Sequence, residues 1–311
     1  MKKGQGKIKI SVVVCTANYS KLFKKTIASI LKNNFRDFEL IIVDQNKTDD
    51  VNNLIKKFYK NNKKIIYLKD NGTGLSRARN IGWKRAKGEI ISYTDDDAYV
   101  DKNWLKNIWL TFKKDKKIGI VGGKIIPVYK NNINSNDFIP KEFEYILPSL
   151  DLGNKIKEYD GGALPPGVNY SIRNNFFEKL GGFDEFFGSN NKRKLQIFGE
   201  DSDMTIRVKK KEYKVIYNYK VIVYHPIKEN RLDINFLKNR FFSEGYTDCL
   251  LFLKHNKVSL VRRFFLFINK FKELFILILN KNNFDEFSFI INTRRILGYI
   301  YGLFSVIFNI I

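Results

Sequence analysis

The sequence predicts an α/β fold: a mainly parallel sheet with helices on both faces, followed by a helical appendage. From residue 8 onwards, short β-branched runs alternate with polar stretches whose apolar residues recur at helical spacing. Such alternation is typical of a parallel sheet whose strands are each followed by a covering helix. After residue 227 the strand-like runs end and long aromatic, helix-period stretches begin. We therefore predict one α/β domain over residues 1–227 and a helical, aromatic-rich extension over residues 228–311.

The apolar runs and the stretches between them give the predicted elements in chain order. Strands are expected at residues 8–15, 38–43, 64–68, 89–94, 214–217 and 221–224. Helices are expected at residues 21–31, 51–59, 75–86 and 103–112. The polar, irregular stretch 131–160 predicts loops that cover the functional site. Because the carboxyl ends of parallel strands meet at one edge of a sheet, the loops after the first four strands are expected to converge there.

The chain is strongly basic, with a formal charge of +24 from 56 Lys and Arg against 32 Asp and Glu in 311 residues. This excess predicts an anionic partner: nucleic acid, a phosphorylated small molecule or an acidic membrane surface. Cys15 and Cys249 are the only cysteines, too few for a disulfide framework or a zinc site. Since the first residues lead into a strand-like run rather than a signal sequence, we expect a cytoplasmic protein.

An acidic triplet, Asp95, Asp96 and Asp97, directly follows the apolar run Ile-Ile-Ser-Tyr-Thr. Three adjacent carboxylates at the mouth of a buried strand repel one another unless a cation or hydrogen bonds take up their charge. In an extended segment Asp95 and Asp97 face the same side, which suits Mg²⁺ or Mn²⁺ bound together with phosphate oxygens. The alternative is a solvated acidic turn that caps the helix starting near Asp101.

Other polar side chains follow the neighbouring predicted strands. Thr16 and Asn18 come after the first strand, and Asp44 ends the second. Asp44 can accept hydrogen bonds from a base or a ribose, or it can cap the following helix. Arg79 lies near the start of a predicted helix, where it can pair with a phosphate or with the acidic triplet, or face solvent. No Gly-x-Gly-x-x-Gly or P-loop pattern occurs, which weakens oxidoreductase and NTPase interpretations.

A second acidic cluster, which contains Glu200 and Asp201, precedes a helix-period stretch. Acids at the start of a helix are stabilised by the helix dipole, so a capping role and a catalytic role both stay open. His225 ends the last predicted strand. A neutral imidazole there can complete a metal site, or it can be a buried, hydrogen-bonded histidine.

The order of these signals resembles an inverting nucleotide-sugar glycosyltransferase of family 2, with the GT-A fold and of the type that assembles bacterial surface polysaccharides. Four segments carry the resemblance: Val-Val-Val-Cys-Thr-Ala-Asn with Ile-Ile-Val-Asp; Gly74 to Gly82 followed by Tyr-Thr-Asp-Asp-Asp; Gly-Gly-Phe-Asp; and Gly-Glu-Asp leading to His225. Together they span residues 8–226. The sequence departs from the common family pattern, in ways that bear on base recognition, at Cys15, Ala17 and Lys47.

The resemblance implies a role for each candidate residue. It assigns to the nucleotide site Thr16, Asn18, Asp44, Arg79, Asp95 and Asp96. It also implies a divalent metal, Mg²⁺ or Mn²⁺, on Asp95 and Asp97, with His225 as a further candidate ligand. Asp201 matches the general base. A metal would neutralise the charge on the departing nucleoside diphosphate, so a single base suffices to take the acceptor proton in one inverting displacement.

The extension contains two stretches of different character. Residues 258–279 indicate an amphipathic helix, with Arg262 and Lys270 among the polar residues on one side and phenylalanines elsewhere. Residues 296–311 carry no charge but are too few to span a bilayer. We interpret them as an in-plane helix on an anionic membrane surface; the alternatives are a helix packed on the main domain and a dimer contact.

Together these patterns predict the transfer of a sugar from a nucleoside diphosphate donor, UDP- or dTDP-linked, to a saccharide or lipid-linked acceptor at the inner face of the cell membrane. We expect peripheral membrane contact through the C-terminal helices and no nucleic-acid partner. A basic nucleic-acid-binding protein is the main rival, although no recognition motif supports it. The second rival is a catalytically silent membrane scaffold with a transferase-like fold. Substituting Asp201 would leave the behaviour of such a scaffold unchanged.

Overall fold

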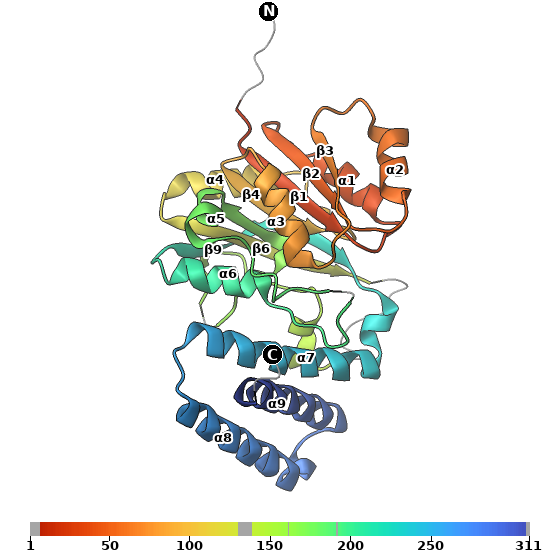
Figure 1. The fold of residues 1–311 in the computed structure, drawn as a ribbon. Helices are drawn as coiled ribbons and strands as arrows, with labels where there is room; N and C mark the ends of the chain where they lie inside the picture. The colour runs from red at the N-terminus through yellow and green to blue at the C-terminus, as the bar shows by residue number, and fades with distance from the viewer. Residues whose placement is uncertain (1–6, 130–138, 161, 191, 309–311) are drawn as a thin grey trace, which may run out of the picture.

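A computed structural model describes residues 7–129, 139–160, 162–190 and 192–308. Figure 1 shows a sheet flanked by helices in one half of the molecule and three long helices in the other. The strands are β1 Ile10–Thr16, β2 Phe38–Asp44, β3 Ile65–Lys69, β4 Ile90–Asp95, β5 Tyr99–Val100, β6 Ile118–Val128, β7 Lys157–Glu158, β8 Tyr170–Arg173 and β9 Lys214–Pro226. The α-helices are α1 Phe23–Leu31, α2 Asp50–Tyr59, α3 Leu75–Arg85, α4 Trp104–Lys114, α5 Asn175–Leu180, α6 Glu200–Lys209, α7 Ile234–His255, α8 Leu260–Leu279 and α9 Glu286–Ile307. Short 3-10 turns lie at Lys141–Ile146, Gly167–Asn169, Glu229–Leu232 and Lys281–Asn283.

The strands form one sheet in the order β3-β2-β1-β4-β8-β6-β9-β5, with β7 paired to β9. The first four strands pair in parallel, as do β6 and β9, whereas β8 runs antiparallel to both of its neighbours. The ends of β1, β2 and β4 therefore lie at one edge, where Thr16 is in register with Asp44 and Cys15 with Asp95. The predicted convergence of the loops after these strands follows from this register.

Helices cover both faces of the parallel strands, and β1 shows how. Val12 and Val14 enter the apolar cluster that contains Phe23 and Ile27 of α1, whereas Val13 enters the cluster that contains Ala78 of α3. Alternate residues of a strand point to opposite faces, so a strand buried on both sides must be apolar throughout. The predicted α/β architecture is confirmed.

The structure differs from these predictions in three places. The two strands expected at 214–217 and 221–224 are one strand, β9, which bulges where its partner β6 shifts register at Gly123 and Lys124. Strand β6 was not predicted. Of the loops expected at 131–160, residues 131–138 lie outside the described residues, and the remainder includes a 3-10 turn and β7.

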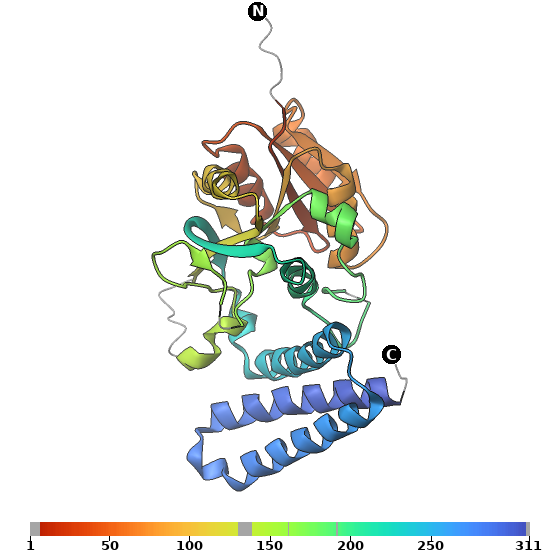
Figure 2. The same ribbon diagram turned by 90° about the vertical axis from the view of Figure 1, so that its left-hand side faces the viewer.

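The three C-terminal helices each begin at a residue whose side chain accepts a backbone hydrogen bond: Asp233, Ser259 and Asp285. Figure 2 shows α8 and α9 as a hairpin, with α9 lying between α8 and α7. Helices α7 and α9 touch backbone to backbone, since a Cβ at Gly298 would collide with the Phe242 carbonyl oxygen. The helix that contains residues 296–307 is therefore packed on α7, which belongs to the same extension. The in-plane membrane helix, packing on the main domain and a dimer contact all stay predictions, and residues 309–311 lie outside the described residues.

Helix α8 is the outermost of the three and is mostly exposed, with Leu277 as its one buried residue. Among the residues that the structure describes, no helix combines the length and the apolar composition needed to cross a bilayer.

Candidate active site

Two carboxylates and an imidazole meet beyond the end of β4. Asp95 and Asp97 face the same side, as predicted, and His225 reaches them from the end of β9. Their candidate ligand atoms all lie within 4.8 Å of one another. The His225 Nε2 atom is 3.4 Å from Asp97 Oδ1 and 3.8 Å from Asp95 Oδ2. His225 is 1% exposed, whereas the Asp95 side chain is 37% exposed and so opens the cluster to a ligand.

Hydrogen bonding on the far side of the ring fixes how His225 faces the two acids. Its Nδ1 atom lies 3.0 Å from the Pro226 carbonyl oxygen, which can only accept a hydrogen bond. In the neutral ring Nδ1 is therefore the donor, and the Nε2 lone pair faces the carboxylates. That contact is favourable only if a proton or a cation lies between the three groups. Two carboxylate oxygens and one imidazole nitrogen form a donor set that fits a divalent metal.

A second corner of the site forms where β1 and β2 end. Asp44 is fully buried, and its Oδ1 atom accepts hydrogen bonds from the Asn46 backbone N and Nδ2 at 2.8 and 2.7 Å. Its Oδ2 atom accepts from the Tyr67 hydroxyl at 2.7 Å and from Lys69 Nζ at 3.1 Å. Asn46 also donates to Thr16 Oγ1. Thr16 and Asp44 are thus brought together as predicted.

The other two candidates near this corner differ in surroundings. Asn18 is exposed in the loop after β1. Asp96 points away from the Asp95 and Asp97 cluster to hydrogen-bond with Thr16. Burial raises the pKa of Asp96 to about 7, and the charges of its two neighbours add to this. Asp95 and Asp97 therefore belong to the cluster with His225, whereas Asp96 lies at the ends of β1 and β2, beside Thr16.

A buried ion pair joins the two acidic segments. Arg79 Nη1 donates to Glu200 Oε1 at 2.5 Å, and Nη2 lies 4.0 Å from Asp95 Oδ1. The guanidinium also lies over the ring of Tyr93 at 5.5 Å. Burial raises the pKa of Glu200 to about 7 although Arg79 acts in the opposite direction. Arg79 is thus present near the acidic triplet, as predicted, but its guanidinium is paired with Glu200.

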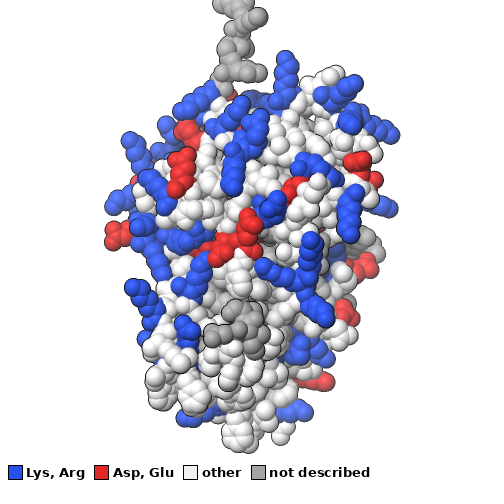
Figure 3. All heavy atoms as spheres, in the orientation of Figure 1, with Lys and Arg blue, Asp and Glu red and all other residues white. Residues whose placement is uncertain are grey.

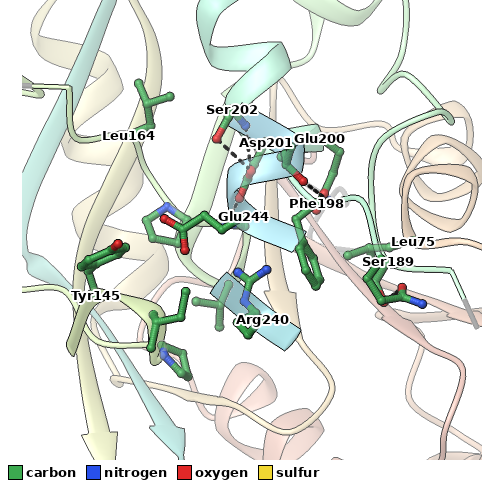
Figure 4. A pocket seen from close by; sticks show the side chains of 18 of the residues that line it. Leu75, Tyr145, Leu164, Ser189, Phe198, Glu200, Asp201, Ser202, Arg240 and Glu244 are labelled. Atoms are coloured by element: carbon green, nitrogen blue, oxygen red, sulfur yellow. Dashed lines mark hydrogen bonds between the residues drawn. The ribbon is translucent and has the colours of Figure 1, made fainter. Parts of the chain in front are cut away.

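Asp201 lies one residue further on and faces a cavity of about 720 Å³, which Asp95 also lines. Its Oδ2 atom accepts a hydrogen bond from the Gly167 backbone N at 2.6 Å, and Oδ1 accepts from the Ser202 backbone N at 2.7 Å. These two backbone donors fix the carboxylate without a side-chain partner that carries charge. Figure 4 shows Asp201 and Glu200 in the upper part of the view, with Glu244 and Arg240 below them.

Sequence reasoning missed several residues of this region. Lys228 Nζ lies 2.9 Å from Asp97 Oδ2, and α7 contributes Arg240 and Glu244 to the pocket wall. Tyr145, from the stretch expected to cover the site, also lines the pocket. These residues stand in no short motif, so the fold alone brings them to the site.

Comparison with known proteins identifies the family. Residues 11–181, more than half of the chain, match the model of glycosyl transferase family 2. The chain belongs to this family.

Two relatives are similar over most of the chain. A glucosyl-dolichyl phosphate glucuronosyltransferase of Haloferax volcanii is 25% identical over 257 residues, which cover 81% of this chain and 80% of that protein. A GalNAc(5)-diNAcBac-PP-undecaprenol beta-1,3-glucosyltransferase of Campylobacter jejuni is 24% identical, with 75% and 70% covered. A structure described as GalNAc-T7 with UDP, GalNAc and Mn²⁺ has a TM-score of 0.55 at 17% identity, and the match covers 78% of this chain and 50% of that one. This likeness supports the GT-A fold, and family membership supports glycosyl transfer.

We predict that Glu200→Gln destabilises the protein by about 3 kcal/mol, because it leaves the buried Arg79 guanidinium without its carboxylate. Glu273→Gln removes a carboxylate of the same type from the exposed pair with Lys270 on α8 and should cost about 0.5 kcal/mol or less. Urea unfolding of both variants measures the two values. Equal losses would contradict a structural role for the Arg79 and Glu200 pair.

Proposed function

We propose that the chain transfers a sugar from a nucleoside diphosphate donor to an acceptor hydroxyl in a single inverting displacement, with Asp201 as the general base. The observation that carries this proposal is the shared pocket: Asp95, a member of the cluster with Asp97 and His225, and Asp201 line the same cavity from different elements. An attack that passes from the side of the base to the side of the leaving group inverts the anomeric carbon.

The donor end of the site is proposed to lie at the cluster of Asp95, Asp97 and His225. These residues would hold Mg²⁺ or Mn²⁺, and the metal when bound would neutralise charge on the leaving diphosphate. Lys228, 2.9 Å from Asp97, adds a fixed positive charge on the same side. With this charge in place the leaving group needs no protonating acid.

The nucleoside end is proposed to lie at the corner of Thr16, Asn18 and Asp44, with Asp96 beside it. Asp44 is fully buried and already accepts four hydrogen bonds, so its proposed part is to hold Asn46 beside Thr16. Arg79 would act on the nucleotide site through its position beside Asp95 rather than as a free cation. A pyrimidine nucleotide, UDP or dTDP, is the proposed carrier.

The base end rests on Asp201. A carboxylate has about four lone-pair positions, and backbone donors from Gly167 and Ser202 occupy only some of them. The remaining positions are available to an acceptor hydroxyl in the cavity. Proton removal at that point typically contributes about 10²- to 10⁴-fold to the rate.

The acceptor is proposed to be a lipid-linked saccharide or lipid phosphate at the cytoplasmic face of the membrane, in surface-polysaccharide assembly. The names of the two relatives from Haloferax and Campylobacter describe sugars carried by a dolichyl phosphate and an undecaprenyl diphosphate. Such an acceptor would require the transferase to work beside a bilayer.

Helix α8 offers a surface for that contact. Val261, Phe264, Phe271, Phe275 and Leu279 recur at helical spacing and are between 46% and 68% exposed. Figure 3 shows that the end of the molecule occupied by the C-terminal helices is largely free of charge on this face, whereas Lys and Arg side chains are spread over the sheet-bearing part. An apolar helix face on a protein of net charge +24 is suited to an anionic bilayer surface.

For the reaction, Asp201→Asn is expected to lower the turnover of nucleotide sugar by about 10²- to 10⁴-fold, because the amide keeps the shape of the side chain but cannot take a proton. Nucleotide binding should be unchanged, since the donor end is intact. The measurement is release of nucleoside diphosphate with a lipid-linked acceptor mixture, alongside calorimetric nucleotide binding. Turnover that survives the substitution would exclude Asp201 as the base, and nucleotide binding without turnover in the wild type would favour the silent scaffold.

For the membrane, Phe275→Asp is expected to weaken binding to phosphatidylglycerol and phosphatidylcholine vesicles by at least about tenfold, because it places a charge in the apolar face of α8. Asn269→Asp adds the same charge to the same helix on its polar side and should have a much smaller effect. Vesicle flotation measures both, with phosphatidylcholine vesicles as the neutral comparison. Wild-type protein that stays free of anionic vesicles would rule out this contact.

A further inference from the structure

Helix α7 forms part of the pocket wall, together with the start of α6. In Figure 4 the Arg240 side chain extends from α7 into the pocket, towards the side where Asp201 and Glu200 lie. Arg240 lines the cavity together with Glu244 and Phe198. The reaction described above gives this arginine no role.

Arg240 is held in place but has no anion of its own. Its guanidinium carbon lies 3.7 Å from the centroid of the Phe198 ring, which fixes its plane. Its Nη1 atom is shielded from solvent and has no hydrogen-bond partner within the described part of the chain. No carboxylate of the described residues lies within ion-pair distance of it, in contrast to Arg79 and its bond to Glu200. Burial lowers the pKa of Arg240, and the charges of Glu244, Asp201 and Glu200 act in the opposite direction.

A buried guanidinium without a paired anion is unfavourable, so its surroundings favour an anionic ligand. The planar fork of arginine binds phosphate oxygens through two parallel hydrogen bonds. The pocket is large enough for a sugar with an attached phosphate, since its volume is about 720 Å³. Glu244 is the acid nearest along the helix, and its Oε1 atom faces Arg295, whose Nη2 atom lies 3.7 Å away.

We propose that Arg240 binds a phosphate group of the acceptor. This inference rests on the proposed function, since it requires an acceptor in the pocket, and it extends that function by assigning a contact to the acceptor. The acidic groups that act on Arg240 are Glu244, Asp201 and Glu200, which lie at the base side of the pocket. Arg231 lines the same pocket and acts both on Arg240 and on Asp95, so it lies between the two ends of the pocket. A phosphate on Arg240 would place the attached sugar between α7 and Asp201.

The test is calorimetric titration of inorganic phosphate into the full chain, with the donor end filled by Mg²⁺ and whichever of UDP or dTDP binds. Wild-type protein should bind phosphate with the nucleotide in place. Arg240→Gln should weaken phosphate binding by at least about tenfold, as expected for the loss of a charge-assisted contact, and leave nucleotide affinity unchanged. Arg240→Lys, which keeps the charge and is less disruptive, should restore part of the affinity.

Arg262→Gln serves as the matched control, because Arg262 is an exposed arginine on α8 away from the pocket. Equal phosphate affinity in wild type and Arg240→Gln would overturn the proposal, and so would an equal loss of nucleotide affinity, which would place Arg240 at the donor end. If neither nucleotide binds the wild type, the proposed function fails separately. The same phosphate titration without nucleotide then decides whether Arg240 binds an anion.

Discussion

Repulsion between carboxylates is the constraint that organises this site. Asp95 at the end of β4 and Glu200 and Asp201 at the start of α6 line one pocket in a strongly basic chain, and Asp97 lies next to Asp95. Each acid is balanced in a different way. Arg79 pairs with Glu200, Lys228 pairs with Asp97, and backbone amides hold Asp201. Asp95 lies beside Arg79 and His225, and together with Asp97 and His225 it forms a cluster that could hold a divalent cation.

The Arg79 and Glu200 pair has a further consequence, because it connects the two halves of the site. Arg79 comes from α3, which packs on the parallel strands, whereas Glu200 opens α6. The buried ion pair would therefore hold the proposed donor end and the proposed base end at a fixed distance from each other. In a displacement reaction the distance between base and leaving group decides the rate, since reacting atoms must be held in line.

The sequence predicts the parallel half of the sheet and the acidic cluster well, and it does so for a physical reason. Strands β1 and β2, which contain Val12 and Ile41, are covered on both faces. Nearly all of their residues are therefore apolar, and such a run is easily detected in the sequence. Asp95, Asp97 and His225 follow such strands directly, and strand register brings them together. Arg240 and Glu244 could not be predicted in this way, because they stand within a helix whose distance from the site depends on tertiary packing.

The C-terminal extension shows the same difference between local pattern and packing. Residues 296–308 carry no charge, which indicated a membrane helix, yet Gly298 allows this segment to pack directly on α7. Gly298 on α9 and Gly245 on α7 allow the two backbones to touch. The mean hydropathy of the segment gives no information about this contact. Packing of α9 on α7 also steadies the wall from which Arg240 enters the pocket, so the extension is part of the site.

The proposed function depends most on a metal-dependent donor site at Asp95, Asp97 and His225. The most direct test is calorimetric titration of UDP and dTDP, with and without Mn²⁺, into the wild type, Asp97→Ala and the surface control Asp115→Ala. We predict that one nucleotide binds the wild type only with Mn²⁺. Asp97→Ala should abolish this binding, and Asp115→Ala should leave it unchanged. Binding that is independent of Mn²⁺ and of Asp97, or no nucleotide binding beside tight, salt-sensitive binding of nucleic acid, would contradict this prediction.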